Sequence, residues 1–241
     1  MKTSFLKLPL LLITVLVSYA EEPQKNKQSK MNKEQRIDDL EKQIKKLSKE
    51  LRELRKDSQM IDSVYKFATP KGDLTLDELF QGKKDLIVIH NMGKDCPYCT
   101  SYADGINGIL KHLENRTSVV LLSPDKVADQ AQFAKSRGWE FRMVSTQKHG
   151  EKFNSDMGFY KPKDGVWPGF SVFHKEGQKI TRVSFSSFDP DDEYCVLFPF
   201  ILMLKDGPNG WYPKFEYKAT GDNQTEPKYR TRCSTTLTAP Q

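Results

Sequence analysis

The sequence predicts an α/β fold, a mixed sheet flanked by helices, with a long amphipathic helix ahead of it. Short apolar runs of strand length alternate with helical patterns over residues 64–145, which is typical of parallel strands joined by crossover helices. Two later apolar runs flank Glu176 and Gly177 and indicate an antiparallel hairpin. Because both kinds of strand belong to one domain, expected over residues 60–217, the sheet should be mixed.

Each element of this domain has a local signal. Apolar, β-branched or aromatic runs bounded by turn residues predict strands at 64–68, 86–90, 118–122, 141–145, 169–174 and 179–186. Helical spacing predicts helices at 74–80, 100–113, 125–137 and 190–205. Gly138 should end the third of these helices, and Pro199 should kink the last.

The segment ahead of the domain, residues 36–58, has the heptad spacing of a coiled-coil-like helix. Its apolar positions are Ile37, Leu40, Ile44, Leu47, Leu51 and Leu54, and charged or polar residues fill most of the positions between them. Three heptads are near the lower limit for a coiled coil. A parallel stalk that makes a homodimer or homotrimer through residues 37–54 and a single helix lying against its own domain therefore both fit.

The chain ends have compositions of their own. Residues 1–20 resemble a secretory signal peptide, with Lys2 and Lys7 before a short apolar run and small residues at Ser18 and Ala20. The run is too short for a confident membrane span, so we expect a secreted or periplasmic protein without a stable span after cleavage, with an uncleaved anchor as the alternative. Residues 21–35 should form a flexible linker, and residues 218–241 a polar tail.

The formal net charge of +6 is concentrated between residues 24 and 57. The rest of the chain is nearly balanced and has no basic face interleaved with aromatic residues. We therefore expect no nucleic-acid partner, and a solvated helix explains the basic excess.

Cys96 and Cys99 are separated by Pro97 and Tyr98, directly after a buried strand and at the start of a helix. Free N–H groups and the positive end of the helix dipole stabilise a thiolate there, and the thiolate is the nucleophile. The motif indicates a redox pair, with Cys96 attacking and Cys99 resolving. An inert structural disulfide or half of a metal site is the alternative, although no second CxxC or HxxxH supplies further zinc ligands. No cofactor is expected.

Two further kinds of modification are suggested by isolated residues. Cys195 and Cys233 can form a structural disulfide that ties the tail to the closing helix, or they remain two unpaired thiols. Asn115 and Asn223 match the glycosylation acceptor pattern, which matters only in a source that secretes through an endoplasmic reticulum.

Several separated blocks agree in order with one family. They are Tyr65–Phe67, Asp77–Phe80, Leu86–His90, Cys96–Cys99, Ala103–Gly108, Arg137–Phe141, Asp156–Phe159, Pro168–Phe173 and Gly210–Phe215. Over about residues 60–217 the chain resembles a thioredoxin-like family of unknown function that is common in bacteria. The resemblance implies a thioredoxin-like fold and supplies no established reaction.

The same resemblance suggests roles for residues near the motif. His90 stands where thioredoxins carry a buried acid, so it is a candidate base for Cys99, or a histidine merely hydrogen-bonded in the interior. Thioredoxin-like proteins place a cis-proline before the strand that faces the CxxC. Pro168 would then be that proline and Trp167 a substrate contact; an ordinary trans proline beside a packed Trp is the alternative. Tyr98 and Pro97 would tune the redox poise, and Tyr98 and Pro168 would bind substrate together with Trp167.

Four functions follow from these residues. The first is a thiol–disulfide oxidoreductase acting on a protein or small-molecule disulfide. The second is a peroxiredoxin-like peroxidase, although Gly93 stands where peroxiredoxins carry Thr. The third is a copper or other metal carrier that uses Cys96, Cys99 and a histidine such as His90. The fourth is a non-catalytic binding module whose functional part is the N-terminal stalk.

Overall fold

The computed structural model describes residues 33–61, 64–190 and 192–217, and the chain divides into two compact units, Met1–Leu51 and Arg52–Gln241. The expected signal peptide and C-terminal tail lie outside the described residues, as does most of the expected linker. No helix in the described ranges has the length and apolar character needed to cross a membrane.

Helix α2 (Lys33–Leu54) accounts for the described part of the first unit and ends in the first residues of the second. Glu34 in its first turn and Arg52 in its last turn match the helix dipole. None of its 22 residues is buried. The expected end at residue 58 is wrong, because the chain enters an edge strand at Lys56. The sheet thus starts before the expected domain boundary at residue 60.

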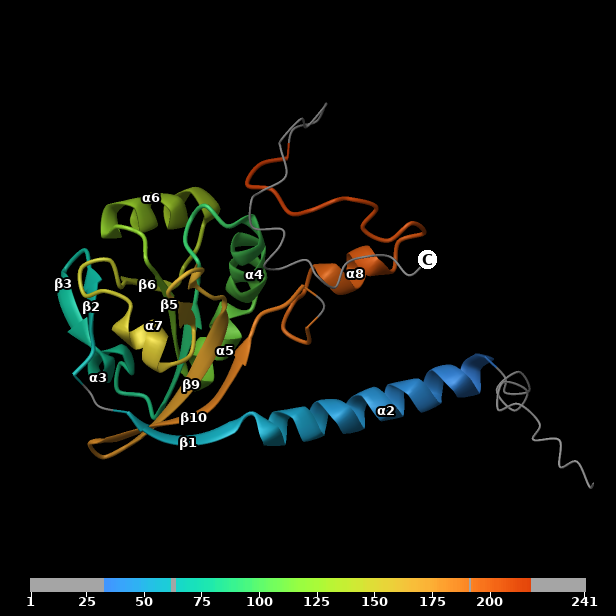
Figure 1. Cartoon of the computed structure of the whole chain (residues 1–241), viewed down its shortest axis with the longest axis horizontal. Coiled ribbons are helices and arrows are strands. Elements are labelled where there is room, and N and C mark those ends of the chain that lie inside the picture. Colours follow the sequence, from blue (N-terminus) through green and yellow to red (C-terminus); the bar gives the residue numbers. More distant parts are fainter. Residues whose placement is uncertain (1–32, 62–63, 191, 218–241) are drawn as a thin grey trace, which may run out of the picture. The chain divides into compact units, whose positions relative to one another are not determined.

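One mixed sheet of eight strands organises the described part of the second unit (Figure 1). Its order is β1-β10-β9-β4-β5-β6-β2-β3. The strands are β1 (Lys56–Ile61), β2 (Lys66–Thr69), β3 (Gly72–Thr75), β4 (Asp85–His90), β5 (Ser118–Ser123), β6 (Arg142–Ser145), β9 (Gly169–Glu176) and β10 (Lys179–Ser187). A separate two-stranded hairpin, β7 (Tyr160–Lys161) and β8 (Gly165–Val166), was not expected from the sequence.

The four adjacent strands β10, β9, β4 and β5 have thioredoxin-like topology. Strands β4 and β5 are parallel, and the chain crosses between them through α4 (Pro97–Gly108) and α5 (Leu110–Arg116). Strand β9 pairs antiparallel with the other edge of β4, and β10 forms a hairpin with β9. The predicted mixed sheet flanked by helices is therefore confirmed.

Strand alternation sorts the core into two clusters, one on each face of the sheet. Leu86 and Val88 of β4 pack with α3 (Leu76–Leu79) and α7 (Lys152–Asp156). Ile87 and Ile89 pack on the other side with α4, α5 and α8 (Phe198–Leu202). Helix α6 (Val127–Arg137) ends at Gly138, as the sequence predicted, and Gly138 has the left-handed conformation with a φ of 66°.

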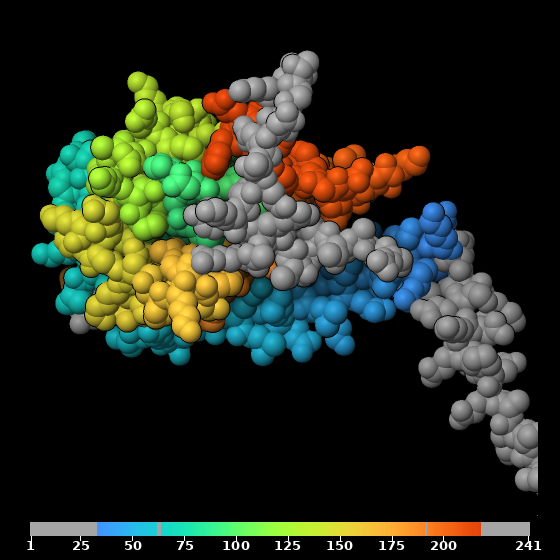
Figure 2. Space-filling model, turned by 45° about the horizontal axis from the view of Figure 1, so that its top comes forward, coloured from blue at the N-terminus to red at the C-terminus, as the bar shows by residue number. Residues whose placement is uncertain are grey.

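The closing helix differs most from expectation. Instead of a kinked helix over 190–205, α8 has five residues, and Pro199 lies in its first turn. A proline is tolerated there because a backbone N–H in the first turn has no partner within the helix. Residues before it form a turn in which the Asp192 carboxylate accepts the N–H groups of Asp189 and Tyr194, both at 2.8 Å. Phe200 and Met203 are strongly exposed, and this orange segment projects from the domain surface in Figure 2.

Gly169, the first residue of β9, provides a test of this packing. A Cβ built there would collide with the Phe159 ring and the backbone of Ser186 and Ser187. We expect Gly169→Ala to lower the free energy of unfolding by about 1–3 kcal/mol. The matched control is Gly108→Ala at the end of α4, where a Cβ meets nothing within 4 Å and helix propensity favours Ala. Urea denaturation compares the two; equal stabilities would contradict the close strand packing at Gly169.

Candidate functional site

Cys96 is the N-cap of α4, as the strand–loop–helix pattern predicted. Its backbone is extended, Pro97 occupies the first turn, and its Sγ accepts the backbone N–H of Cys99 at 3.2 Å. A sulfur at this position satisfies one of the free N–H groups at the helix start. The structure holds Cys96 and Cys99 as two thiols.

The Cys96 thiol is more acidic than an ordinary cysteine. A hydrogen bond from the Cys99 side chain is the largest cause that lowers its pKa, while burial opposes it, and the N–H groups of Cys99 and Tyr98 lower it further. The charge of Lys94 does not explain this shift. Its ammonium pairs with the Asp95 carboxylate at 3.0 Å, and that pairing raises the pKa of Lys94 itself.

The loop between β4 and α4 is anchored at the carboxyl ends of two parallel strands. The Asn91 side chain accepts the N–H of Gly93 at 2.8 Å, and the Asn91 N–H donates to Leu122 of β5 at 2.9 Å. The Asp125 carboxylate accepts the N–H of Lys94 at 2.9 Å. Gly93 has a φ of 109°, and a Cβ there would lie 3.0 Å from the Asp125 carboxylate. A threonine would be strained and crowded at this position, which explains the glycine.

Both sulfurs are sheltered from solvent. Cys96 is 1% exposed and Cys99 is 4% exposed. A cavity of about 10 Å³ lies beside the second cysteine, lined by Tyr98, Cys99, Tyr102, Pro168, Phe188 and Pro190. This volume is near the minimum for a single water molecule. This cavity is too small for an organic disulfide, so both sulfurs must become more exposed before such a substrate can reach them.

Pro168 lies where the resemblance placed it, sharing the small cavity with Cys99. The expected cis bond is wrong: the described residues contain no cis peptide, so the Trp167–Pro168 bond is trans. Trans is the intrinsically preferred isomer of an X–Pro bond. The Pro168 carbonyl accepts the Phe188 N–H at 3.0 Å, which joins the loop after β10 to the start of β9.

Trp167 does not line that cavity. Its N–H donates to the Phe159 carbonyl at 2.7 Å, and the Lys161 ammonium lies 4.0 Å from the centre of its ring. The indole Nε1 is buried without a hydrogen-bond acceptor. Contact between Trp167 and a substrate therefore stays a prediction. Tyr98 does line the cavity, and its ring stacks on Phe198 of α8.

His90 cannot be the base for Cys99, because its side chain lies on the opposite face of the sheet. Alternate residues of a strand point to the same face, so His90 lies on the face of Leu86 and Val88. The cysteines pack on the other face, with Ile87 and Ile89. Its ring stacks on Phe159 with centroids 4.1 Å apart, in the other core. The alternative of a histidine hydrogen-bonded in the interior is the one that fits.

A chain of buried polar groups holds this histidine. His90 Nδ1 donates to the Asn154 carbonyl oxygen at 2.6 Å, and Nε2 accepts the Ser171 hydroxyl at 2.9 Å. The Asn154 amide donates in turn to Glu151 at 2.6 Å. The order Ser–His–Asn resembles a hydrolytic triad, but Ser171, His90 and Asn154 are each 0% exposed. Substrate cannot reach the Ser171 hydroxyl, so the role of the chain is structural.

Residues that sequence reasoning missed lie on the cysteine face. Tyr102, one turn after Cys99, lines the cavity and donates its hydroxyl to the Asp189 carbonyl. Its hydroxyl also interacts with Asp192 and Cys195, and burial raises the pKa values of all three side chains. The spacing of Tyr102 from Cys99 places both on one helix face, a signal that the sequence contained.

The remaining sequence predictions concern modification. Cys195 is buried in the cysteine cluster, and its proposed partner Cys233 lies outside the described residues. Asn115 is exposed in the last turn of α5, whereas Asn223 also falls outside the described ranges. The disulfide and both glycosylation sites stay predictions.

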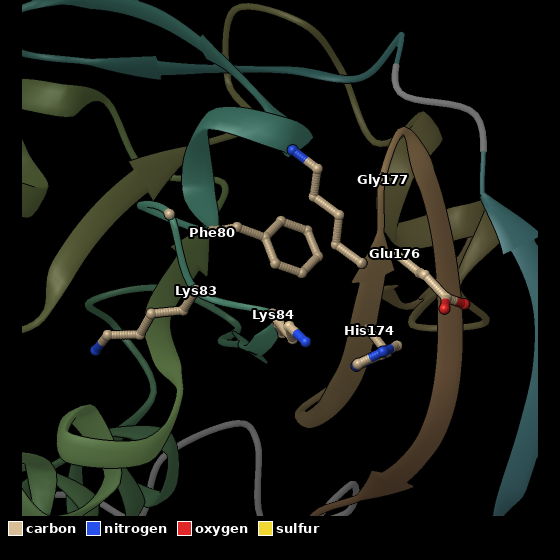
Figure 3. A pocket seen from close by; sticks show the side chains of 8 residues that line it. Phe80, Lys83, Lys84, His174, Glu176 and Gly177 are labelled. Atoms are coloured by element: carbon tan, nitrogen blue, oxygen red, sulfur yellow. The ribbon is translucent and has the colours of Figure 1, made fainter.

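A larger, lysine-lined pocket of about 330 Å³ lies at the other end of β4 (Figure 3). Most of its basic side chains have partners within the fold. Lys175 pairs with Asp77, and His174 with Asp85. Lys83 donates to backbone carbonyls of Glu114 and Thr117, and Figure 3 shows its side chain extending away from Phe80 and His174. These groups serve the fold, and the cysteines remain the chemically distinctive site.

Buried His90 predicts a pH dependence of stability. Burial lowers its pKa to about 3 from 6.5, so below pH 6.5 the unfolded chain binds a proton that the folded chain does not. The contribution of neutral His90 to the free energy of unfolding is therefore fully present at pH values well above 6.5. It decreases on acidification, by roughly 2 kcal/mol between pH 7 and pH 5. Urea denaturation across this range should show the slope.

In His90→Gln the loss between pH 7 and pH 5 should disappear, whatever the starting stability. His112→Gln, at an exposed position on α5, is the matched control and should keep the wild-type slope. A His90→Gln protein that retains the slope would show that another group causes it.

Comparison with solved structures finds distant similarities over the sheet domain. Peroxidoxin BcpB from Mycobacterium tuberculosis is 19% identical, with 55% of this chain and 85% of that chain covered and a TM-score of 0.47. Peroxiredoxin Q from Xanthomonas campestris is 16% identical, with 55% of this chain and 87% of that chain covered and a TM-score of 0.47. The 1-Cys peroxiredoxin of Plasmodium falciparum is 17% identical, covering 58% and 94%, with a TM-score of 0.49. These similarities are too distant to assign a reaction.

The search of curated proteins finds no match. A family model covers most of the sequence, including α2 and the whole Cys96–Cys99 region. It is described as "Bacterial protein of unknown function (DUF899)" and matches residues 15–210. The resemblance to a thioredoxin-like family of unknown function is thereby confirmed, and the chain belongs to the DUF899 family of bacterial proteins.

Proposed function

We propose that this protein is a thiol–disulfide oxidoreductase in which Cys96 is the nucleophile and Cys99 the resolving thiol. The observation that supports it best is the Cys96 sulfur at the N-cap of α4, accepting the Cys99 N–H at 3.2 Å. The same contacts favour the thiolate over the thiol. An inert structural disulfide would need no such stabilisation of its reduced form.

The reaction has two steps. The Cys96 thiolate attacks one sulfur of a substrate disulfide, forms a mixed disulfide, and releases the other substrate sulfur as a thiolate that takes a proton. Cys99 then loses its proton and attacks the Cys96 sulfur. The Cys96–Cys99 disulfide forms and the second substrate thiol leaves, so the substrate gains two electrons and the protein loses two. The reverse sequence oxidises a substrate dithiol.

Proton transfer from Cys99 requires an acceptor on its own face of the sheet. Tyr102 lines the cavity with Cys99, and its hydroxyl interacts with Asp192. Burial keeps the tyrosine protonated, so the hydroxyl passes a proton only as it receives one. Asp192, a half-buried carboxyl on the loop before α8, is the terminal acceptor in this proposal.

A peroxidase is the second candidate, favoured by the size of the cavity. A space near one water molecule suits a small peroxide better than a protein disulfide. The Cys96 thiolate would attack the O–O bond to give a sulfenic acid and an alcohol or water, and Cys99 would condense with it and release water. Gly93 in place of Thr still counts against this reaction.

A metal carrier and a binding module rank lower. His90, the histidine considered as a third metal ligand, lies on the opposite face of the sheet from both cysteines. The extracytoplasmic location also remains part of this proposal, and it rests on the pattern of residues 1–20. It is consistent with a disulfide substrate, since disulfides persist outside the reducing cytosol.

Insulin reduction with dithiothreitol as electron donor tests the main proposal. The wild-type protein should accelerate the reaction, and Cys96→Ser should fall to the uncatalysed rate because the attacking sulfur is gone. Cys99→Ser should accumulate a mixed disulfide with the substrate, visible by mass spectrometry. His112→Gln, at an exposed position on α5, is the control and should retain activity.

Two outcomes would oppose the proposal. If Cys96→Ser reduces insulin as fast as the wild type, the motif is not the reaction centre. If the wild type consumes hydrogen peroxide rapidly and ignores insulin, the peroxidase is the better assignment.

Asp192→Asn tests the proton acceptor. Stopped-flow measurement of mixed-disulfide resolution should show a rate at least about 10² lower than in the wild type, the usual size of a general-base effect. In the wild type the rate should fall on acidification through a pKa raised above 3.8, because only the carboxylate accepts a proton. The asparagine variant should lack that dependence.

Glu193→Gln is the matched control, because Glu193 pairs with Arg52 and Arg55 at the surface. It should resolve the mixed disulfide at the wild-type rate. Equal rates in Asp192→Asn and Glu193→Gln would remove Asp192 from the mechanism.

A further inference from the structure

Helix α2 carries a continuous seam of apolar side chains along one face. None of its residues is buried, and the six apolar side chains of the heptads are 40–77% exposed: Ile37, Leu40, Ile44, Leu47, Leu51 and Leu54. In proteins, most helical stability comes from the packing of an apolar face rather than from helix propensity. An exposed apolar seam of six residues is therefore a candidate contact surface for a partner.

The residues in the seam select the kind of partner. Ile37, Ile44 and Leu51 occupy the first apolar position of each heptad, and Leu40, Leu47 and Leu54 occupy the second. Isoleucine at the first position with leucine at the second favours a coiled coil of two parallel helices over one of three or four helices.

The flanking positions fit a parallel pair in the same register. In that arrangement the residue before each first apolar position faces the partner's residue five places later. Arg36 would face Glu41 of the second copy, and Glu50 would face its Arg55, so both pairs join opposite charges. Because Arg55 already pairs with Glu193 in its own chain, the Arg36–Glu41 pair provides the cleaner test.

A membrane surface is the other common partner of an amphipathic helix, and α2 does not suit it. Helices of that kind carry Trp or Phe on a broad apolar face and a predominantly basic polar face. The stripe on α2 is narrow and aliphatic, and Asp38, Asp39 and Glu41 lie among its lysines.

We propose that α2 pairs with α2 of a second copy in a parallel, in-register, two-stranded coiled coil. The interface does not depend on the redox proposal. Since only Arg55 separates α2 from β1, the two chains leave the coiled coil at the same end. The dimer would thus carry two sheet domains, each with its own cysteine pair, beyond the same end of the stalk.

Sedimentation equilibrium of the full chain at micromolar concentration tests the pairing. The wild type should have the mass of a dimer. Ile44→Lys, which puts a charge in the middle of the seam, should have the mass of a monomer. Lys49→Ala, on the outer face of the same heptad, is the matched control and should stay dimeric. Circular dichroism and urea denaturation check that the sheet domain of each variant is folded.

Charge reversal tests orientation and register. Arg36→Glu and Glu41→Arg should each raise the dimer dissociation constant roughly three- to tenfold at low salt, and the double variant should restore it. Leu40→Cys should form a disulfide between copies on mild oxidation, because a parallel in-register pair places these positions face to face.

The remaining outcomes would overturn the proposal. A monomeric wild type removes the pairing, and a monomer that co-sediments with anionic phospholipid vesicles assigns the seam to lipid. A trimeric mass contradicts a coiled coil of two helices. A dimer that survives Ile44→Lys has its interface elsewhere, and a double charge variant weaker than both single variants contradicts the parallel register.

Discussion

The contact on which the rest of the site depends is the hydrogen bond from the Cys99 N–H to the Cys96 sulfur. It exists because Cys96 takes the N-cap of α4, where the backbone donors of the first turn have no intrahelical partner. A serine or aspartate often fills this position to stabilise a helix. Here a sulfur does so, and the same contact that starts the helix also favours the thiolate.

That contact is positioned by the sheet. Asn91 and Asp125 follow the carboxyl ends of β4 and β5, and both accept N–H groups of the loop that leads to Cys96. Gly93 adopts a positive φ so that the chain can turn against the Asp125 carboxylate. These contacts fix the loop that leads to the Cys96 sulfur, and chemistry that depends on orientation requires such positioning.

The two faces of the sheet have separate tasks. One face holds the cysteines with Tyr102, Pro168 and the segment after β10, and it contains the small cavity. The other face contains the His90–Asn154–Glu151 chain within an aromatic core. A buried polar chain whose members all have partners fixes the packing of α7 on the sheet without exposing a reactive group.

The sequence by itself determined what depends on near neighbours: the strand–loop–helix around Cys96, the heptads of α2, the hairpin at Gly177 and the end of α6 at Gly138. Tertiary structure alone decided which face of β4 meets the cysteines, because β4 is apolar on both sides and its alternation does not say which parity faces α4. For this reason the sequence could not show that His90 lies on the face of the sheet opposite Cys99. Strand β1, with Ile61 as its sole buried residue, and the short α8 were missed because long-range pairing with β10 and the turn around Asp192 set them. The shelter of both sulfurs also arises from segments far apart in the chain, which no local pattern records.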